Sequence, residues 1–162
     1  RQMCIRDRCR RDGLCSFGGQ VNDIIKRIDE FDGIVAGSPV YYASASGQIT
    51  SFMDRLFYAA GRKMRGKVGA AVVSCRRGGA SAAFDQLNKY FSISQMPIAT
   101  SVYWNQVHGN TPEQVREDNE GLQTMRYLGE NMAWLIKCIQ AGKAAGVAEP
   151  EQEKRVTTNF IR

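Results

Sequence analysis

The clearest chemical signal in the chain is a run of small, hydroxyl-bearing and aromatic residues at positions 38–47. The short apolar run 34–36 stops at Gly37, and five residues that could meet a ligand follow it: Ser38, Pro39, Val40, Tyr41 and Tyr42. Open α/β sheets bind ligands at the carboxyl ends of their strands, where turns present backbone N–H groups and side chains. We therefore expect a ligand contact here. The alternative is a strand-to-helix turn whose tyrosines fill a core.

A second candidate site follows the continuous apolar run 68–74. It consists of Ser74, Cys75, Arg76, Arg77, Gly78 and Gly79. The two glycines would let the backbone approach a ligand closely, and the neighbouring arginines would lower the pKa of the Cys75 thiol. A catalytic thiol is not expected, because the single histidine, His108, lies in a different loop. The alternative is a solvated basic turn.

A third loop, 103–108, carries Tyr103, Trp104 and His108 after the last predicted strand. It should lie at the same edge of the sheet as the other two loops, where it would wall the substrate side of a ligand site. The alternative is a packed aromatic loop with a structural or exposed histidine.

Hydrophobic periodicity predicts the elements that position these loops. We expect helices at 20–31, 46–60 and 80–91, and a final helix from Thr111 to about residue 141. Strands are expected at 33–37, 68–74 and 96–102. Strict alternation of helices and strands indicates a parallel sheet with right-handed crossovers. The final helix should begin with a Thr111 cap, Pro112 in the first turn and Gln114 completing a capping box, and Cys138 should be a core thiol within it.

The segment GSPVYYASASGQ followed by FMDRLFY resembles the second flavin-contacting loop of the flavodoxin-like, NAD(P)H-dependent FMN reductase family. The resemblance implies an α/β fold with a doubly wound parallel sheet, three layers deep, whose five strands run in the order 2-1-3-4-5. Because three strands are visible, we expect the first two to be missing. Residues 1–8, RQMCIRDR, look like translated sequencing adapter, which indicates a gene cut upstream. The expected division is an irregular leader at 1–19, an incomplete flavodoxin-like domain at 20–145 and a tail at 146–162.

The resemblance also implies that FMN binds at the strand ends. The flavin ring would lie along Pro39 and the residues after it, with Tyr41 or Tyr42 against a ring face. The loop from Ser74 through Arg76, Arg77, Gly78 and Gly79 would border the ring, and an arginine there would stabilise negative charge on it. The family's phosphate-binding loop has no counterpart before Gln20.

Five cysteines, an odd number and unevenly spread, do not indicate a disulfide framework. Iron–sulfur flavoproteins, a related group, carry a compact C-x2-C-x2-C-x(4–7)-C motif. Cys9 and Cys15 would match its last two positions, which implies a possible [4Fe-4S] cluster in the intact protein. Two thiolates are not a cluster site, so no metal is expected in this chain as it stands.

The implied function is an FMN-dependent oxidoreductase that takes hydride from NAD(P)H and passes it to a quinone, a flavin or a similar acceptor, with no catalytic side chain required. The alternatives are an iron–sulfur flavoprotein and a flavodoxin-type electron carrier, although carriers are typically acidic and this chain has a net charge of +6. Half of that charge lies in residues 1–12, so nucleic acid is not an expected partner. We expect no membrane contact, a cytoplasmic location and a homodimer or higher oligomer, with the helix segment 52–58 and Tyr103–Trp104 as candidate contacts.

Overall fold

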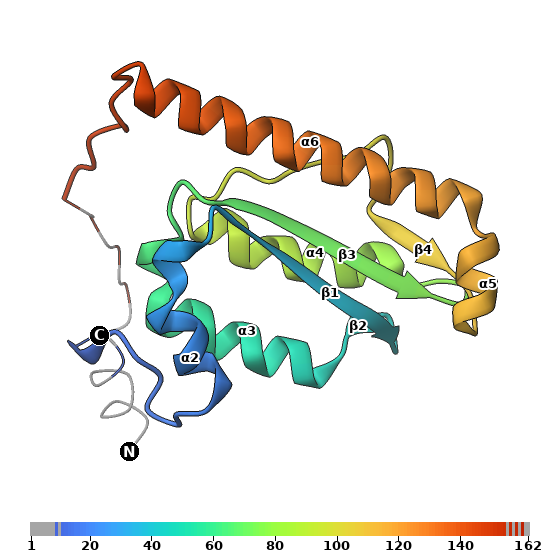
Figure 1. The fold of residues 1–162 in the computed structure, drawn as a ribbon. Coiled ribbons are helices and arrows are strands. Elements are labelled where there is room, and N and C mark those ends of the chain that lie inside the picture. Colours follow the sequence, from blue (N-terminus) through green and yellow to red (C-terminus); the bar gives the residue numbers. More distant parts are fainter. Residues whose placement is uncertain (1–8, 10, 155, 157, 159, 161–162) are drawn as a thin grey trace.

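A computed structural model describes residue 9, residues 11–154 and residues 156, 158 and 160 (Figure 1). The adapter-like residues 1–8 lie outside this part. The main elements are α2 (Gln20–Lys26), β1 (Gly33–Tyr41), β2 (Ser44–Ala45), α3 (Gly47–Ala60), β3 (Val68–Cys75), α4 (Ala80–Ile93), β4 (Gln106–His108), α5 (Pro112–Glu117) and α6 (Asn119–Ala144). The predicted alternation of helices and strands is confirmed only in part, because β2 follows β1 without a helix between them and is antiparallel to it, and the helix expected at 20–31 ends at Lys26. Short 3-10 helices, η1 (Ile28–Glu30) and η2 (Gly61–Met64), follow α2 and α3.

The described strands form one sheet in the order β2-β1-β3-β4. β1 and β3 are parallel, with partners from Gly33↔Val68 to Pro39↔Ser74, and β4 is parallel to the last residues of β3. The arrowheads of these three strands point to the same side of the molecule in Figure 1. The loops after them therefore meet at one edge of the sheet, as the sequence predicts. The expectation of two further strands stays a prediction.

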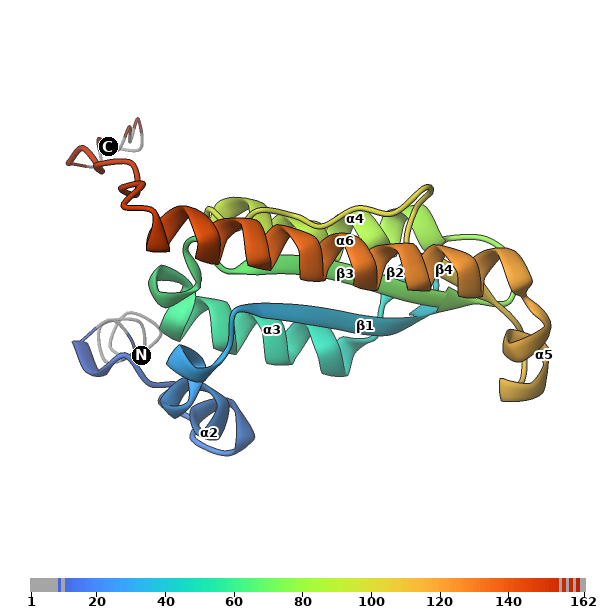
Figure 2. The ribbon, with the colours of Figure 1, turned by 45° about the horizontal axis from the view of Figure 1, so that its top comes forward.

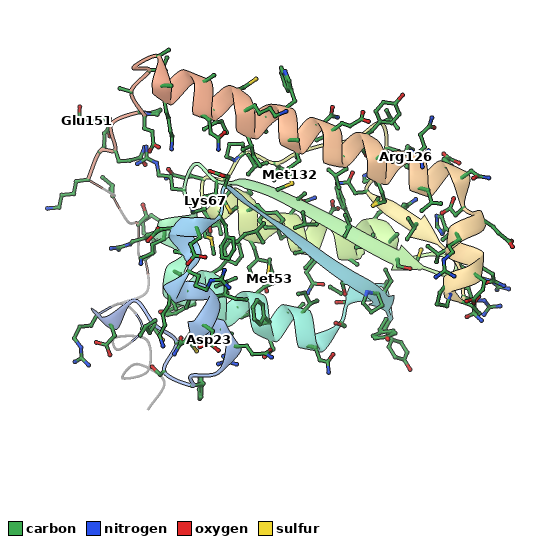
Figure 3. The ribbon with its side chains drawn as sticks, viewed as in Figure 1. Asp23, Met53, Lys67, Arg126, Met132 and Glu151 are labelled. Carbon is green, nitrogen blue, oxygen red and sulfur yellow. The ribbon has the colours of Figure 1, made fainter. Side chains whose placement is uncertain are left out.

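Helices cover the sheet on both faces, which confirms the layered α/β arrangement (Figure 2). The larger core joins α2, α3 and α4 to β1 and β3, and Phe91 is completely buried in it. On the other face α6 packs Leu128 and Met132 against Val68 and Ala70. Figure 3 shows Met53 and Met132 on opposite sides of the strands. The parallel strands are therefore apolar on both faces, which explains the continuous run of β3.

Close approach of helix and strand requires a glycine at position 69. A Cβ there would lie 2.6 Å from the Phe91 ring. Phe91 also makes an edge-to-face contact with Phe57, with ring centroids 5.9 Å apart. The aromatic side chains of α3 and α4 thus meet below β3 because that strand has no side chain at this point.

The predicted strand at 96–102 is wrong. The chain touches β3 at an isolated bridge, Gly69↔Ile98, then leaves the sheet and returns as β4 at Gln106–His108. Asn105 binds this segment to β3 again. Its side-chain Nδ2 donates to the Ala71 carbonyl at 3.0 Å, and its backbone carbonyl accepts from the Val73 N–H at 2.9 Å. A side chain thus replaces part of the strand ladder, which hydrophobic periodicity cannot detect.

The single final helix of the sequence prediction is divided at Asp118 into α5 and α6. The Thr111 cap is confirmed, since its hydroxyl accepts from the Gln114 N–H at 3.4 Å. Gln114 does not complete a capping box: its side chain accepts from the Asn110 N–H at 2.7 Å instead of from the N–H of Thr111. Asp118 then caps α6 by accepting from the Gly121 N–H at 2.9 Å.

Cys138 is exposed on α6, so its expected place in the core is wrong. The stripe that faces the sheet includes Leu128, Met132 and Ile136. At 3.6 residues a turn, position 138 points about 100° away from the middle of that stripe. Although α6 has 26 residues, none of the described helices is both long and apolar enough to cross a membrane.

Candidate functional site

The first candidate loop is a tight β-hairpin. β1 does not stop at Gly37 but continues to Tyr41, which pairs with Ser44 of β2. The two central residues, Tyr42 and Ala43, have φ angles of 51° and 58°. Two left-handed residues in a two-residue hairpin are the geometry that usually selects Asn and Gly. The chain therefore holds strained backbone at the end of β1, and strain of this kind clusters at ligand sites.

The tyrosines of this hairpin do not fill a core. Tyr41 is 61% exposed and Tyr42 is fully exposed. The structural alternative for this loop is thus excluded for both side chains. What remains is an aromatic surface at the carboxyl end of a parallel strand, where a flat ring could stack.

Hydrogen bonds hold the hairpin from beneath. The buried Ser38 hydroxyl accepts from the Ser46 N–H at 2.8 Å and donates to the Pro39 carbonyl at 2.7 Å. From α4, Gln86 Oε1 accepts from the Ser44 hydroxyl at 2.9 Å and from the Ala45 N–H at 3.0 Å. The Ser38 hydroxyl is therefore used within the loop, and Gln86 is a supporting residue that no sequence signal marks.

The second candidate loop touches the first. Gly79 has φ of +91°, and a Cβ there would lie 2.7 Å from Cα of Ala43. Gly78 has open space around it, and Arg76 and Arg77 are exposed. Two loops more than thirty residues apart in the chain are thus brought together, as the sequence predicts for adjacent parallel strands.

Cys75 and His108 are neighbours, although the sequence places them in separate segments of the chain. They are register partners at the ends of β3 and β4, and Cys75 Sγ lies 3.4 Å from His108 Nδ1. Burial raises the pKa of the Cys75 thiol and outweighs the backbone hydrogen bonds from Arg77 and Ala80 that lower it. The expectation that the arginines lower this pKa is therefore wrong, and the thiol stays protonated near neutral pH.

The third loop is joined to α6 through Asp118. Its Oδ2 accepts from the His108 backbone N–H at 2.6 Å, while Oδ1 caps the helix. Burial raises the pKa of this carboxyl, but the hydrogen bonds from Gly121 and His108 lower it more, so the pKa falls below its usual range. Tyr103 and Trp104 stack edge to face with centroids 4.3 Å apart. Sequence reasoning missed Asp118, although Asp directly before a helical apolar pattern is a recognisable helix cap.

The candidate cluster ligands lie in the segment before α2. Cys15 is buried; its Sγ accepts from Arg55 Nε at 3.2 Å, and Asn22 binds its backbone N–H and carbonyl at 2.7 and 3.0 Å. Cys9 is buried with Sγ 3.5 Å from the Ser16 hydroxyl. In the part of the chain that the structure describes, no three His, Cys, Asp or Glu side chains gather to hold a metal. These residues do not fit a four-thiolate cluster.

The two loops at the ends of β1 and β3 have a different character. The hairpin carries two exposed tyrosines, and the loop that touches it has open space at Gly78 and exposed guanidinium groups at Arg76 and Arg77. A glycine-lined approach and an aromatic wall suit a flat heteroaromatic ring, and exposed guanidinium groups suit its electron-rich edge.

Comparison with known proteins identifies the family of the chain. The sequence profile of the NADPH-dependent FMN reductase family matches residues 1–111. An iron–sulfur flavoprotein of Methanocaldococcus jannaschii is 34% identical over 140 residues, which cover 82% of this chain and 72% of that protein. An iron–sulfur flavoprotein of Archaeoglobus fulgidus is 27% identical over 148 residues, covering 83% and 74%.

Solved structures share the fold at low identity. The flavodoxin-type WrbA-like protein of Agrobacterium tumefaciens superposes with a TM-score of 0.56 at 16% identity, over 76% of this chain and 78% of that one. Rubredoxin oxygen:oxidoreductase of Desulfovibrio gigas has a TM-score of 0.56 at 14% identity, over 85% of this chain and 32% of that one. With its flavodoxin-like fold and its match across residues 1–111, the chain belongs to the NADPH-dependent FMN reductase family.

Proposed function

We propose that this protein is an FMN-dependent NAD(P)H oxidoreductase that passes hydride through the flavin to a quinone, a flavin or a similar acceptor. The observation that carries the proposal is the contact between the strained hairpin at Tyr42–Ala43 and the loop at Gly79. It puts two exposed tyrosines and two exposed arginines at one strand-end site. Family membership supports flavin chemistry at that site.

When bound, FMN supplies the hydride and electron chemistry, and the protein supplies position and charge. Tyr41 and Tyr42 would pack against the ring and shield one side of it from water. Backbone N–H groups of the 38–42 strand end would bind its polar edge. Arg76 and Arg77 would favour negative charge on the reduced ring and attract the phosphates of the donor. A catalytic acid or base is not part of the proposal.

A second candidate is an iron–sulfur flavoprotein, favoured by the names of the relatives. The described residues do not complete a cluster site, so we place no step through one. A flavodoxin-type electron carrier is less well supported, because the net charge is +6. Failure of NADPH to bleach bound FMN would favour the carrier.

We also propose self-association through exposed aromatic side chains, as a homodimer or higher oligomer in the cytoplasm. Tyr58, Tyr103 and Trp104 are 43%, 54% and 44% exposed. Phe57, in contrast, is buried in the core and is not available as a contact.

The test is a visible absorption spectrum of the chain mixed with FMN, desalted, and then treated with NADPH without oxygen. We expect a retained flavin spectrum that NADPH bleaches. The Tyr41→Ser/Tyr42→Ser double variant should bind FMN about tenfold more weakly, and the matched control Tyr58→Ser should bind like the parent. A colourless desalted protein, or equal losses in both variants, would contradict the proposal.

A further inference from the structure

α6 is the outer helix on its face of the sheet, and in Figure 1 no described segment lies beyond it. It has 26 residues, and its buried residues, Gly121, Thr124 and Leu128, all lie in its first part. The rest of the helix covers the sheet with partly buried side chains and leaves its outer surface to solvent. A long helix exposed in this way offers a surface on which a partner could pack.

Apolar side chains form a line along this outer surface. Trp134 is 67% exposed and Tyr127 is 40% exposed. Cys138 and Ala141 continue the line, and both are exposed. At 3.6 residues per turn, Trp134 lies about 120° around the helix axis from Leu128, so this line is separate from the stripe that packs on the sheet.

The spacing of the line is that of a seam between two helices. Tyr127, Trp134 and Ala141 are seven residues apart, and Cys138 stands four residues after Trp134. Positions that repeat every seven residues stay in contact with a second helix, because seven residues make almost two turns. Asn131 fills the remaining position, and its Nδ2 donates to the Thr100 carbonyl at 2.8 Å. We call residues 127, 134, 138 and 141 the outer stripe.

Two opposite charges flank the outer stripe. Glu130 and Lys137 are exposed, lie seven residues apart on the same side of the stripe, and belong to no ion pair among the described residues. In a second copy packed antiparallel, with Trp134 at the two-fold axis, the partner's Lys137 would lie beside Glu130, and the symmetric pair would form as well. A parallel copy would bring Glu130 level with the partner's Glu130 instead. The charges therefore favour a second copy of this chain and one direction of packing.

We propose that α6 packs antiparallel against α6 of a second copy through the outer stripe. The two Trp134 rings meet at the axis, and Tyr127 lies over the partner's Ala141, whose small side chain leaves room for the ring. The contact uses neither Tyr58 nor the loop 103–104, so it is additional to the self-association proposed above. The stripe spans about 21 Å of helix, which is short, and we expect association in the micromolar range.

The test is sedimentation equilibrium of the full chain at about 10 to 200 μM. It contains no FMN, so its outcome does not depend on the proposed flavin site. Trp134→Gln should weaken association about tenfold, which lowers the average mass toward half that of the parent. Phe17→Gln is the matched control, because Phe17 is 70% exposed and lies before α2. Both variants should keep the thermal transition of the parent. Equal masses for the parent and the Trp134 variant would overturn the proposal.

Charge reversal tests the direction of packing. Glu130→Lys and Lys137→Glu should each weaken association about three- to fivefold, because each puts like charges together at both ends of the contact. The double variant Glu130→Lys/Lys137→Glu should restore association. An equimolar mixture of the two single variants should also associate like the parent. Single variants that associate like the parent, or a double variant as weak as the single ones, would overturn the antiparallel contact.

Discussion

The hairpin after β1 and the loop after β3 touch each other but are built in opposite ways. The hairpin is closed: Ser38 and Gln86 bond its backbone from beneath, and its strained tip presents Tyr41 and Tyr42. The loop after β3 is open, with Arg76 and Arg77 exposed and glycine where the backbone must come close. The hairpin thus presents aromatic side chains on a hydrogen-bonded backbone. The loop after β3 presents positive charge, and its glycine allows its backbone to pack closely against the hairpin.

The contact between the loops is the most sensitive point of this comparison. Gly79→Ala should cost about 2–3 kcal/mol of unfolding free energy, because it combines a left-handed φ with a clash against the Ala43 backbone. Urea unfolding measures the loss. Gly78→Ala is the matched control, since a Cβ there meets nothing within 4 Å. Equal losses in the two variants would show that the loops do not touch as described.

The closed character of the hairpin depends on Gln86. Gln86→Ala should cost about 1–2 kcal/mol, because the Ala45 N–H and the Ser44 hydroxyl lose their acceptor. Lys89→Ala, on the same helix and exposed, should change stability by less than about 0.5 kcal/mol. Thermal or urea unfolding of both variants measures the difference. An unchanged stability of the Gln86 variant would mean that the hairpin does not need the hydrogen bonds to Gln86.

The strain at the hairpin tip predicts a gain in stability. Ala43→Gly should stabilise the protein by about 0.5–1 kcal/mol, because glycine adopts the left-handed conformation without strain. Ala82→Gly, in the exposed face of α4, should instead cost about 0.5–1 kcal/mol. Opposite signs in urea unfolding would confirm the strain, and a loss in both variants would refute it.

The open loop should contribute little to stability. The Arg76→Gln/Arg77→Gln double variant should unfold within about 0.5 kcal/mol of the parent. Its proposed role predicts about three- to tenfold weaker FMN binding, measured by quenching of flavin fluorescence. Arg62→Gln on η2 is the control for a simple change of net charge. A stability loss without a binding loss would make these arginines structural.

The regular part of the fold was predictable, because repeated apolar spacing marks α3, β3 and α4 to within two residues. Hydrophobic periodicity failed where the hydrogen bonds of single polar side chains determine the path of the chain. Asn105 substitutes for strand ladder, so the last strand was placed at 96–102 instead of Gln106–His108. Asp118 divides one apparent helix into two. Both are polar residues whose side chains hydrogen-bond to backbone outside their own element, Asn105 to Ala71 and Asp118 to His108.

The same limit applies to the candidate site. The two loops and their residues followed from the strand ends and from the family resemblance. The pairing of Cys75 with His108 could not be predicted, because the sequence of either strand alone does not determine the register between β3 and β4. Gln86 supports the hairpin from a helix face that carries no periodic signal.

β3 is hydrogen-bonded to β1 along one side and, at its last three residues, to β4 on the other, and most of its residues are buried. Its amides can exchange with deuterated solvent only when the whole sheet opens, so they should record the global unfolding free energy. The hairpin residues lie at the end of that sheet and need a smaller opening. The molecule therefore has a gradient of protection that falls from its central strand toward the loops where a ligand would bind, and those loops can adjust while the strand that carries them stays closed.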